Sequence, residues 1–203
     1  MTLAWLGLLL QVACLASPAQ PPSERKARFV PGELIVKFKA GSEGARLVAG
    51  PTTATDARGS LGPYTERLSR EIGLPVEAKR ALSGGEILLS LGLPSLTNRL
   101  LTEVKKEGAL KEATLEEGGA RTGGLTFPAV RARQIATGTD AKALTKRLTE
   151  RLGFLVESRA ADGEQILLFV DSEALTLRAL EALKARPDVE YAQLNYVLGR
   201  LSP

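Results

Sequence analysis

The sequence predicts an α+β protein built from two similar units, each with the order strand–helix–strand–strand–helix–strand. Three observations lead to this prediction: an internal repeat, apolar residues that alternate as in strands, and apolar residues at helical spacing. The repeat is carried by three pairs of matching segments, which share the positions of their leucines, threonines and glycines. They are 65–77 with 145–157, 86–91 with 165–170, and 96–105 with 175–184.

The N-terminal stretch "MTLAWLGLLLQVACLASPAQPP" is apolar and uncharged, and it ends in small residues just before Gln20. This pattern predicts a signal peptide over residues 1–19, and the apolar part is too short for a stable membrane span. Lipid attachment at Cys14 and a retained anchor stay open as alternatives. Cleavage implies a secreted or periplasmic chain that leaves the membrane. Residues 20–28 are polar and contain proline, so we expect a linker there.

The first unit is predicted to cover residues 29–117. Its first helix carries Tyr64, Leu68 and Ile72 on one face and ends at Gly73 as a left-handed cap. The segment 41–62 is rich in Gly, Ser and Thr and predicts a loop. The remaining expected elements are a strand over 33–39, a hairpin over 75–91 with "SGG" at its turn, a helix over 94–104 and a closing strand over 110–117.

The second unit is predicted to cover residues 126–203, after a flexible linker over 118–125 that contains "GGARTGG". Its first helix carries Leu144, Leu148 and Leu152 and ends at Gly153. The other expected elements are a strand over 128–135, a hairpin over 155–170 with "ADG" at its turn, a helix from 172 and a closing strand over 189–197 that continues into a tail.

With right-handed crossovers, this order gives a four-stranded antiparallel sheet with both helices on one face, the ferredoxin-like arrangement. The sequence therefore predicts two tandem ferredoxin-like units.

Composition excludes several kinds of function. The chain has no histidine and a single cysteine, so a histidine-assisted nucleophile and nearly every transition-metal site are ruled out. We therefore expect no enzyme activity, no cofactor and no metal. The 27 basic and 23 acidic residues are mixed along the chain, which favours a solvated surface and no nucleic-acid partner.

Two segments carry a resemblance to a known family. "VPGELIVKFKAG" (30–41) resembles the opening strand of the inhibitor-type propeptides of subtilisin-like serine proteases, especially the fervidolysin-like branch. "ALKARPDVEYAQLNYVL" (182–198) resembles their closing helix and strand, and residues 151–170 fit the middle. The chain departs from the family because we expect no catalytic domain and because the two motifs fall on different units. Either each unit has the propeptide fold, or one such domain is interrupted by an extra copy.

The resemblance implies a subtilisin-like serine protease as partner. In the family, the sheet packs on two surface helices of the protease, and the segment after the last strand lies in the substrate groove. The residues that this implies for protease binding are Tyr196 at the strand end and the tail residues Leu198, Gly199, Arg200 and Leu201.

Within that tail, Leu198 and Leu201 would be apolar anchors, and Gly199 would leave room for the protease backbone. Asp162 and Glu164 are further candidates, because carboxylates are favoured at helix N-termini; an ordinary solvated Asp-Gly turn is the alternative for this pair. We expect a monomer that inhibits or chaperones the protease in trans. The alternative function is a structural or adaptor protein of the cell envelope.

Overall fold

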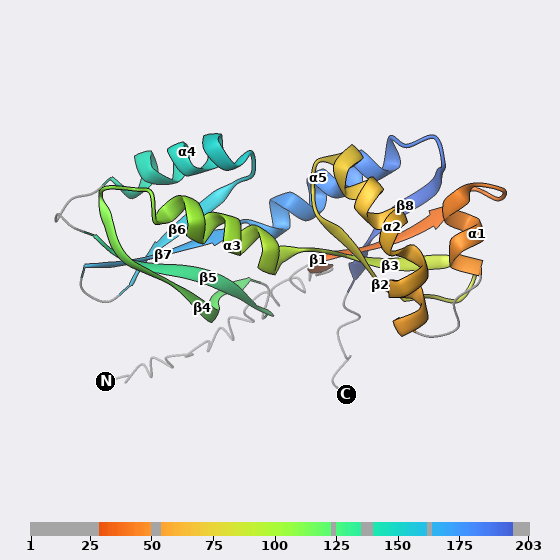
Figure 1. The fold of residues 1–203 in the computed structure, drawn as a ribbon, viewed down its shortest axis with the longest axis horizontal. Helices are drawn as coiled ribbons and strands as arrows, with labels where there is room; N and C mark the ends of the chain where they lie inside the picture. The colour runs from red at the N-terminus through yellow and green to blue at the C-terminus, as the bar shows by residue number, and fades with distance from the viewer. Residues whose placement is uncertain (1–28, 50–53, 123–124, 135–139, 162–163, 197–203) are drawn as a thin grey trace, which may run out of the picture.

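The computed structural model describes residues 29–49, 54–122, 125–134, 140–161 and 164–196, which form helices and strands in one α+β fold (Figure 1). The elements, in chain order, are β1 (Phe29–Phe38), α1 (Glu43–Ala49), α2 (Ala54–Ile72), β2 (Val76–Ala81), β3 (Glu86–Leu91), α3 (Leu93–Val104), β4 (Leu110–Thr122), β5 (Leu125–Gln134), α4 (Ala141–Leu152), β6 (Val156–Ala160), β7 (Gln165–Val170), α5 (Ser172–Lys184) and β8 (Val189–Tyr196).

The strands form two antiparallel sheets of four strands each. The first sheet has the order β2-β3-β1-β8, and the second has the order β4-β5-β7-β6. In Figure 1 the helices lie on one side of these sheets, with α2 and α5 over the first and α3 and α4 over the second. The predicted α+β class with antiparallel sheets is confirmed.

The sheets do not correspond to the two sequence units 29–117 and 126–203. The sequence predicts that each unit keeps its own last helix and strand, whereas α3 and β4 join the second sheet and α5 and β8 join the first. We call residues 29–122 the N-terminal half and residues 125–196 the C-terminal half. Each half places its last helix and strand on the sheet of the other, and we call this the exchanged arrangement.

The crossings occur at two equivalent points, where the chain leaves β3 and β7. The N–H of Gly92 donates to the carbonyl of Pro75 at 2.9 Å, and the N–H of Asp171 donates to the carbonyl of Leu155 at 3.1 Å. Each crossing is thus tied to the sheet that the chain is leaving before the next helix begins.

The β4–β5 hairpin gives a physical reason for the exchange. Residues 118–122 continue β4, and β5 begins at Leu125, although the sequence predicts a flexible linker over 118–125. Gly118 has a φ of 73° at an irregularity in the register between Glu116 and Ala120, so a glycine lets the strand bend there and continue. Two neighbouring strands joined by a short loop pair at small entropic cost, and this draws β4 away from β1.

The helix ends follow local sequence signals. The side chain of Asp140 accepts hydrogen bonds from the N–H groups of Lys142 and Ala143 at 3.0 and 3.2 Å, so it caps α4. Gly153 ends α4 with a φ of 75°, the predicted left-handed cap, and Gly73 after α2 has a φ of 70°. None of the helices in the described ranges is long and apolar enough to cross a membrane.

The predicted loop over 41–62 is wrong, because α1 and the start of α2 lie within it. The apolar contacts that hold α1 are few but close. Val48 and Gly44 are buried, and the Gly44 backbone lies against the ring of Phe38. That ring meets Tyr64 of α2 edge to face, with 5.3 Å between the ring centroids. A glycine-rich composition therefore conceals a helix here, because its close approach needs a residue without a side chain.

Replacing Gly44 by alanine is expected to destabilise the protein, although alanine is the better helix former. A Cβ at this position would lie 2.6 Å from Cγ of Phe38, and such overpacking costs about 1–3 kcal/mol. Gly62 in α2 is the matched control, since a Cβ there has nothing within 4 Å; Gly62→Ala should stabilise by up to about 1 kcal/mol. Urea unfolding of both variants checks the opposite signs, and equal stabilisation would contradict the packing of α1.

Candidate functional site: the outer face of the first sheet

Strand β8 is an edge strand of the first sheet and lies beside β1, its neighbour in the sheet although it comes at the far end of the chain. The register pairs Val36 with Ala192 and Lys37 with Tyr191. The segments 30–41 and 182–198, which carry the resemblance, thus meet in one sheet. Because β8 is at the edge, the strand that leads into the C-terminal tail has one side without a neighbouring strand among the described residues.

The face of the first sheet away from the helices is called here the outer face. Leu34, Val36 and Phe38 of β1 point into the core and are at most 3% exposed, so the residues between them point outward. The residues of the three central and edge strands on the outer face are Glu33, Ile35 and Lys37 of β1, Glu86, Leu88 and Ser90 of β3, and Tyr191, Gln193 and Asn195 of β8.

Polar contacts hold Glu33 near one end of the outer face. Nδ2 of Asn195 donates to Oε2 of Glu33 at 2.6 Å, so β8 is tied to β1 by side chains as well as by the backbone. The ammonium of Lys79 from β2 pairs with the same carboxylate. Glu33 therefore holds a fixed negative charge between three strands.

A second group of contacts lies around Tyr191. Its hydroxyl donates to the carboxylate of Glu86, and this hydrogen bond raises the pKa of the Tyr191 phenol. Nζ of Lys37 lies 5.8 Å from the centre of the Tyr191 ring and 3.2 Å from Oε1 of Glu190. The two groups of contacts flank a small apolar centre formed by Ile35 and Leu88, which are opposite each other in the register.

This arrangement suits binding rather than catalysis. The outer face combines an apolar centre, fixed carboxylates and an edge strand, and it offers no nucleophile paired with a base. Within the described part of the chain, no three His, Cys, Asp or Glu side chains gather as they would around a metal ion.

The structure separates the residues that the sequence predicts for the site. Tyr196 is the last residue of β8, is 51% exposed, and pairs with Phe29. Glu164 is exposed in the turn before β7, where its carbonyl accepts from the N–H of Gln134 at 2.8 Å. It thus belongs to the second sheet, whereas Tyr196 belongs to the first. Leu198, Gly199, Arg200, Leu201 and Asp162 lie outside the described residues.

Sequence reasoning did not select Glu33, Tyr191 and Asn195. The signal was present, because alternation along β1 and β8 places polar side chains opposite the buried positions. What the sequence did not supply was the neighbour: Glu33 and Asn195 are 162 positions apart and meet only because β8 joins the first sheet.

Comparison with protein-family models, with curated proteins and with solved structures finds no match to this chain.

Proposed function

We propose that this chain is a non-catalytic binding protein that inhibits or chaperones a subtilisin-like serine protease in trans. The observation that carries the proposal is the pairing of β1 with β8. The two segments that resemble a subtilisin propeptide are separated by a copy of the same unit, yet they lie side by side in one sheet. This favours a single propeptide-like domain interrupted by an extra copy, the second of the two alternatives that the sequence leaves open.

The order of the first sheet supports the same proposal. In the order β2-β3-β1-β8, with α2 and α5 on one face, β8 takes the place of the closing strand of a ferredoxin-like unit. The second sheet has the matching order β4-β5-β7-β6, and we interpret it as a permuted copy of the same unit. A fold of this kind hosts many functions, so the fold supports the proposal only together with the two segments.

In the proposed complex, the outer face of the first sheet packs on two surface helices of the protease. Ile35 and Leu88 would supply the apolar contact. Glu33 and Glu86 would face the positive ends of those helices, a role that Glu164 is poorly placed to fill because it lies in the second sheet. The tail after Tyr196 would then bind in the substrate groove as an added strand, with main-chain hydrogen bonds for affinity and Leu198 and Leu201 for specificity.

Inhibition assays test the proposal directly. The full chain should slow a subtilisin-like protease, and a variant that lacks residues 198–203 should lose at least about tenfold in inhibition, or roughly 1.4 kcal/mol. That deletion removes none of the described residues. A chymotrypsin-like serine protease is the negative control for the enzyme.

Substitutions on the two sheets provide a matched comparison. Ile35→Arg on β1 should weaken inhibition, whereas Leu167→Arg, at a similarly half-buried position on β7 of the second sheet, should not. If the full chain slows no subtilisin-like protease, the proposal is wrong and an adaptor function remains. If inhibition survives the deletion but not Ile35→Arg, the face binds the protease without help from the tail.

A further inference from the structure

The two sheets carry the same ion pair with its charges inverted. In the repeat, Glu71 of α2 is equivalent to Arg151 of α4, and Glu107 after α3 is equivalent to Arg186 after α5. In the structure, Arg186 pairs with Glu71 and Arg151 pairs with Glu107. Each pair joins a helix to the end of the helix that comes from the other half of the chain.

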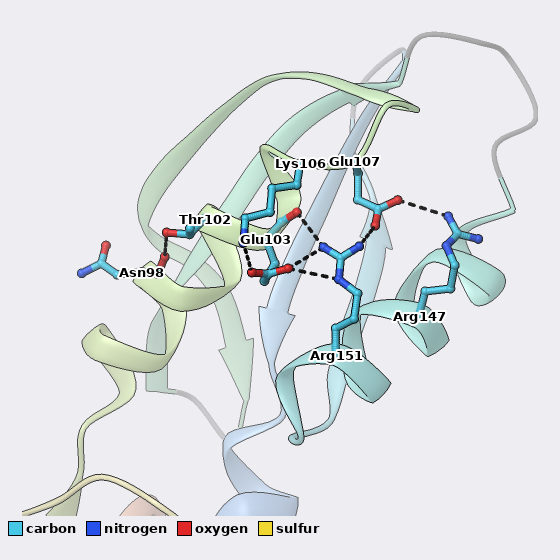
Figure 2. A network of polar contacts seen from close by, with 7 residues as sticks. All are labelled: Asn98, Thr102, Glu103, Lys106, Glu107, Arg147 and Arg151. Carbon is cyan, nitrogen blue, oxygen red and sulfur yellow. Dashed lines mark hydrogen bonds and ion pairs between the residues drawn. The ribbon is translucent and has the colours of Figure 1, made fainter.

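The contacts between α3 and α4 are shown in Figure 2. Nη1 of Arg151 lies 2.5 Å from Oε1 of Glu107, and Nη2 lies 2.6 Å from Oε2 of Glu103. Nη2 of Arg147 lies 3.3 Å from the other oxygen of Glu107. The side chain of Glu107 is only 9% exposed, so its charge depends on these two arginines. Hydrogen bonds from Lys106 and Arg151 lower the pKa of Glu103.

The corresponding contacts between α2 and α5 have a second component. The Arg186 side chain, 18% exposed, pairs with Glu71 and also donates from Nε and Nη2 to Asp188 at 2.9 and 3.0 Å. The hydroxyl of Tyr64 donates to Oδ2 of Asp188 at 2.9 Å. The equivalents of Tyr64 and Asp188 in the other copy are the apolar pair Leu144 and Ala109.

The alternative arrangement, in which each unit keeps its own last helix and strand, would bring the wrong partners together. Glu107 would face Glu71, and only Arg67, which now pairs with Glu43, could offset this repulsion. Arg186 would face Arg147 and Arg151.

In that alternative arrangement, Asp188 would move with Arg186, and its carboxylate would meet Leu144 in place of the Tyr64 hydroxyl. A buried charge that loses its partner, and like charges brought together, are both unfavourable.

We propose that the inverted charges at positions 71, 107, 151 and 186 specify which sheet each helix–strand segment joins, so that each half of the chain selects the other half as its partner. The hairpin β4–β5 favours the exchange through chain connectivity, and the charges disfavour the alternative. This proposal does not depend on protease binding.

A cycle of charge reversals in the full chain tests it. Glu71→Arg with Arg151→Glu, and separately Glu107→Arg with Arg186→Glu, each leave the net charge unchanged but place like charges opposite each other in the exchanged arrangement. The variant with all four reversals restores both pairs. Unwanted contacts with Glu103 and Asp188 occur in the doubles and in the quadruple alike, so they cancel in the coupling.

A disulfide reporter shows which arrangement forms. With Cys14→Ser, which removes the only cysteine, Ile35→Cys and Gln193→Cys are opposite each other in β1 and β8 and can cross-link in the exchanged arrangement. Thr114 is the equivalent of Gln193 in the other copy, so Ile35→Cys with Thr114→Cys cross-links only if β4 joins β1.

The expected result is that the parent and the quadruple variant form the 35–193 cross-link, while each double variant loses it, through a shift to the 35–114 cross-link or through failure to fold. The coupling between the two doubles should change the unfolding equilibrium constant by on the order of tenfold, since each reversal replaces attraction with repulsion. The proposal is overturned if the doubles keep the 35–193 cross-link and unfold at the same urea concentration as the parent. It is equally overturned if the quadruple variant is no more stable than independent effects of the two doubles predict.

Discussion

Ending the chain after Asp188, which removes β8, is expected to unfold the first sheet, whose other strands all come from the N-terminal half of the chain. Without β8, the core side of β1 loses the cover of Val189 and Ala192, which are 5% exposed, and β1 loses its backbone partner. The loss of a strand of four, with its buried apolar area, amounts to several kcal/mol against a total of about 5–15 kcal/mol for a typical domain. Amide hydrogen exchange should show β1 and β3 losing protection first.

A chain that ends after Tyr196 is the control, because it keeps β8 and should retain the protection of β1. The second sheet provides the contrast. If the exchange were absent, β8 would stabilise β5, and its removal would deprotect β5 and β7 before β1. That order of loss in the exchange experiment would contradict the exchanged arrangement.

Local structure could be predicted from this sequence because local signals determine it. The left-handed caps at Gly73 and Gly153 and the hairpins that follow them are each encoded by a few neighbouring residues, and the structure has them where the sequence predicts them. The segment 41–62 was missed because its helices depend on close contact with Phe38, a tertiary effect that overrides composition.

The partnership of the strands could not be predicted in the same way. β4 and β8 come from two copies of one unit, so hydrophobic periodicity fits either strand beside β1. The choice depends on long-range terms: the short connection between β4 and β5, and the partners of side chains such as Arg186 and Glu107. The candidate site shares this dependence, since Tyr196 could be named from the sequence, but the contact between Glu33 and Asn195 requires β8 to lie beside β1.

Asp188→Ala is expected to destabilise the protein by about 2–3 kcal/mol, since it leaves a donor on Tyr64 and a mostly buried Arg186 without their acceptor. Tyr64→Phe removes only one neutral donor and keeps the edge-to-face contact with Phe38, so it should cost about 1 kcal/mol. Urea unfolding at neutral pH measures both. Equal effects of the two substitutions would show that Arg186 does not depend on Asp188.

The same carboxylate makes stability depend on pH. Burial by itself would raise the pKa of Asp188, but the hydrogen bonds from Arg186 and Tyr64 outweigh it and hold the pKa below its usual value. A carboxyl with a lowered pKa in the folded state stabilises the protein above its unfolded pKa of about 3.9. This contribution is lost as pH falls through the lower, folded pKa.

The parent should therefore lose more stability than Asp188→Ala between about pH 4 and pH 2. The pKa values of Glu103 and Glu116 are also lowered by their basic partners, but both carboxylates are present in the parent and in the variant, so the difference isolates Asp188. Parallel losses of stability would mean that the carboxylate of Asp188 is not held by Arg186 and Tyr64. A steeper loss in the parent would show that a single charged group on the segment from one half of the chain stabilises its attachment to the other.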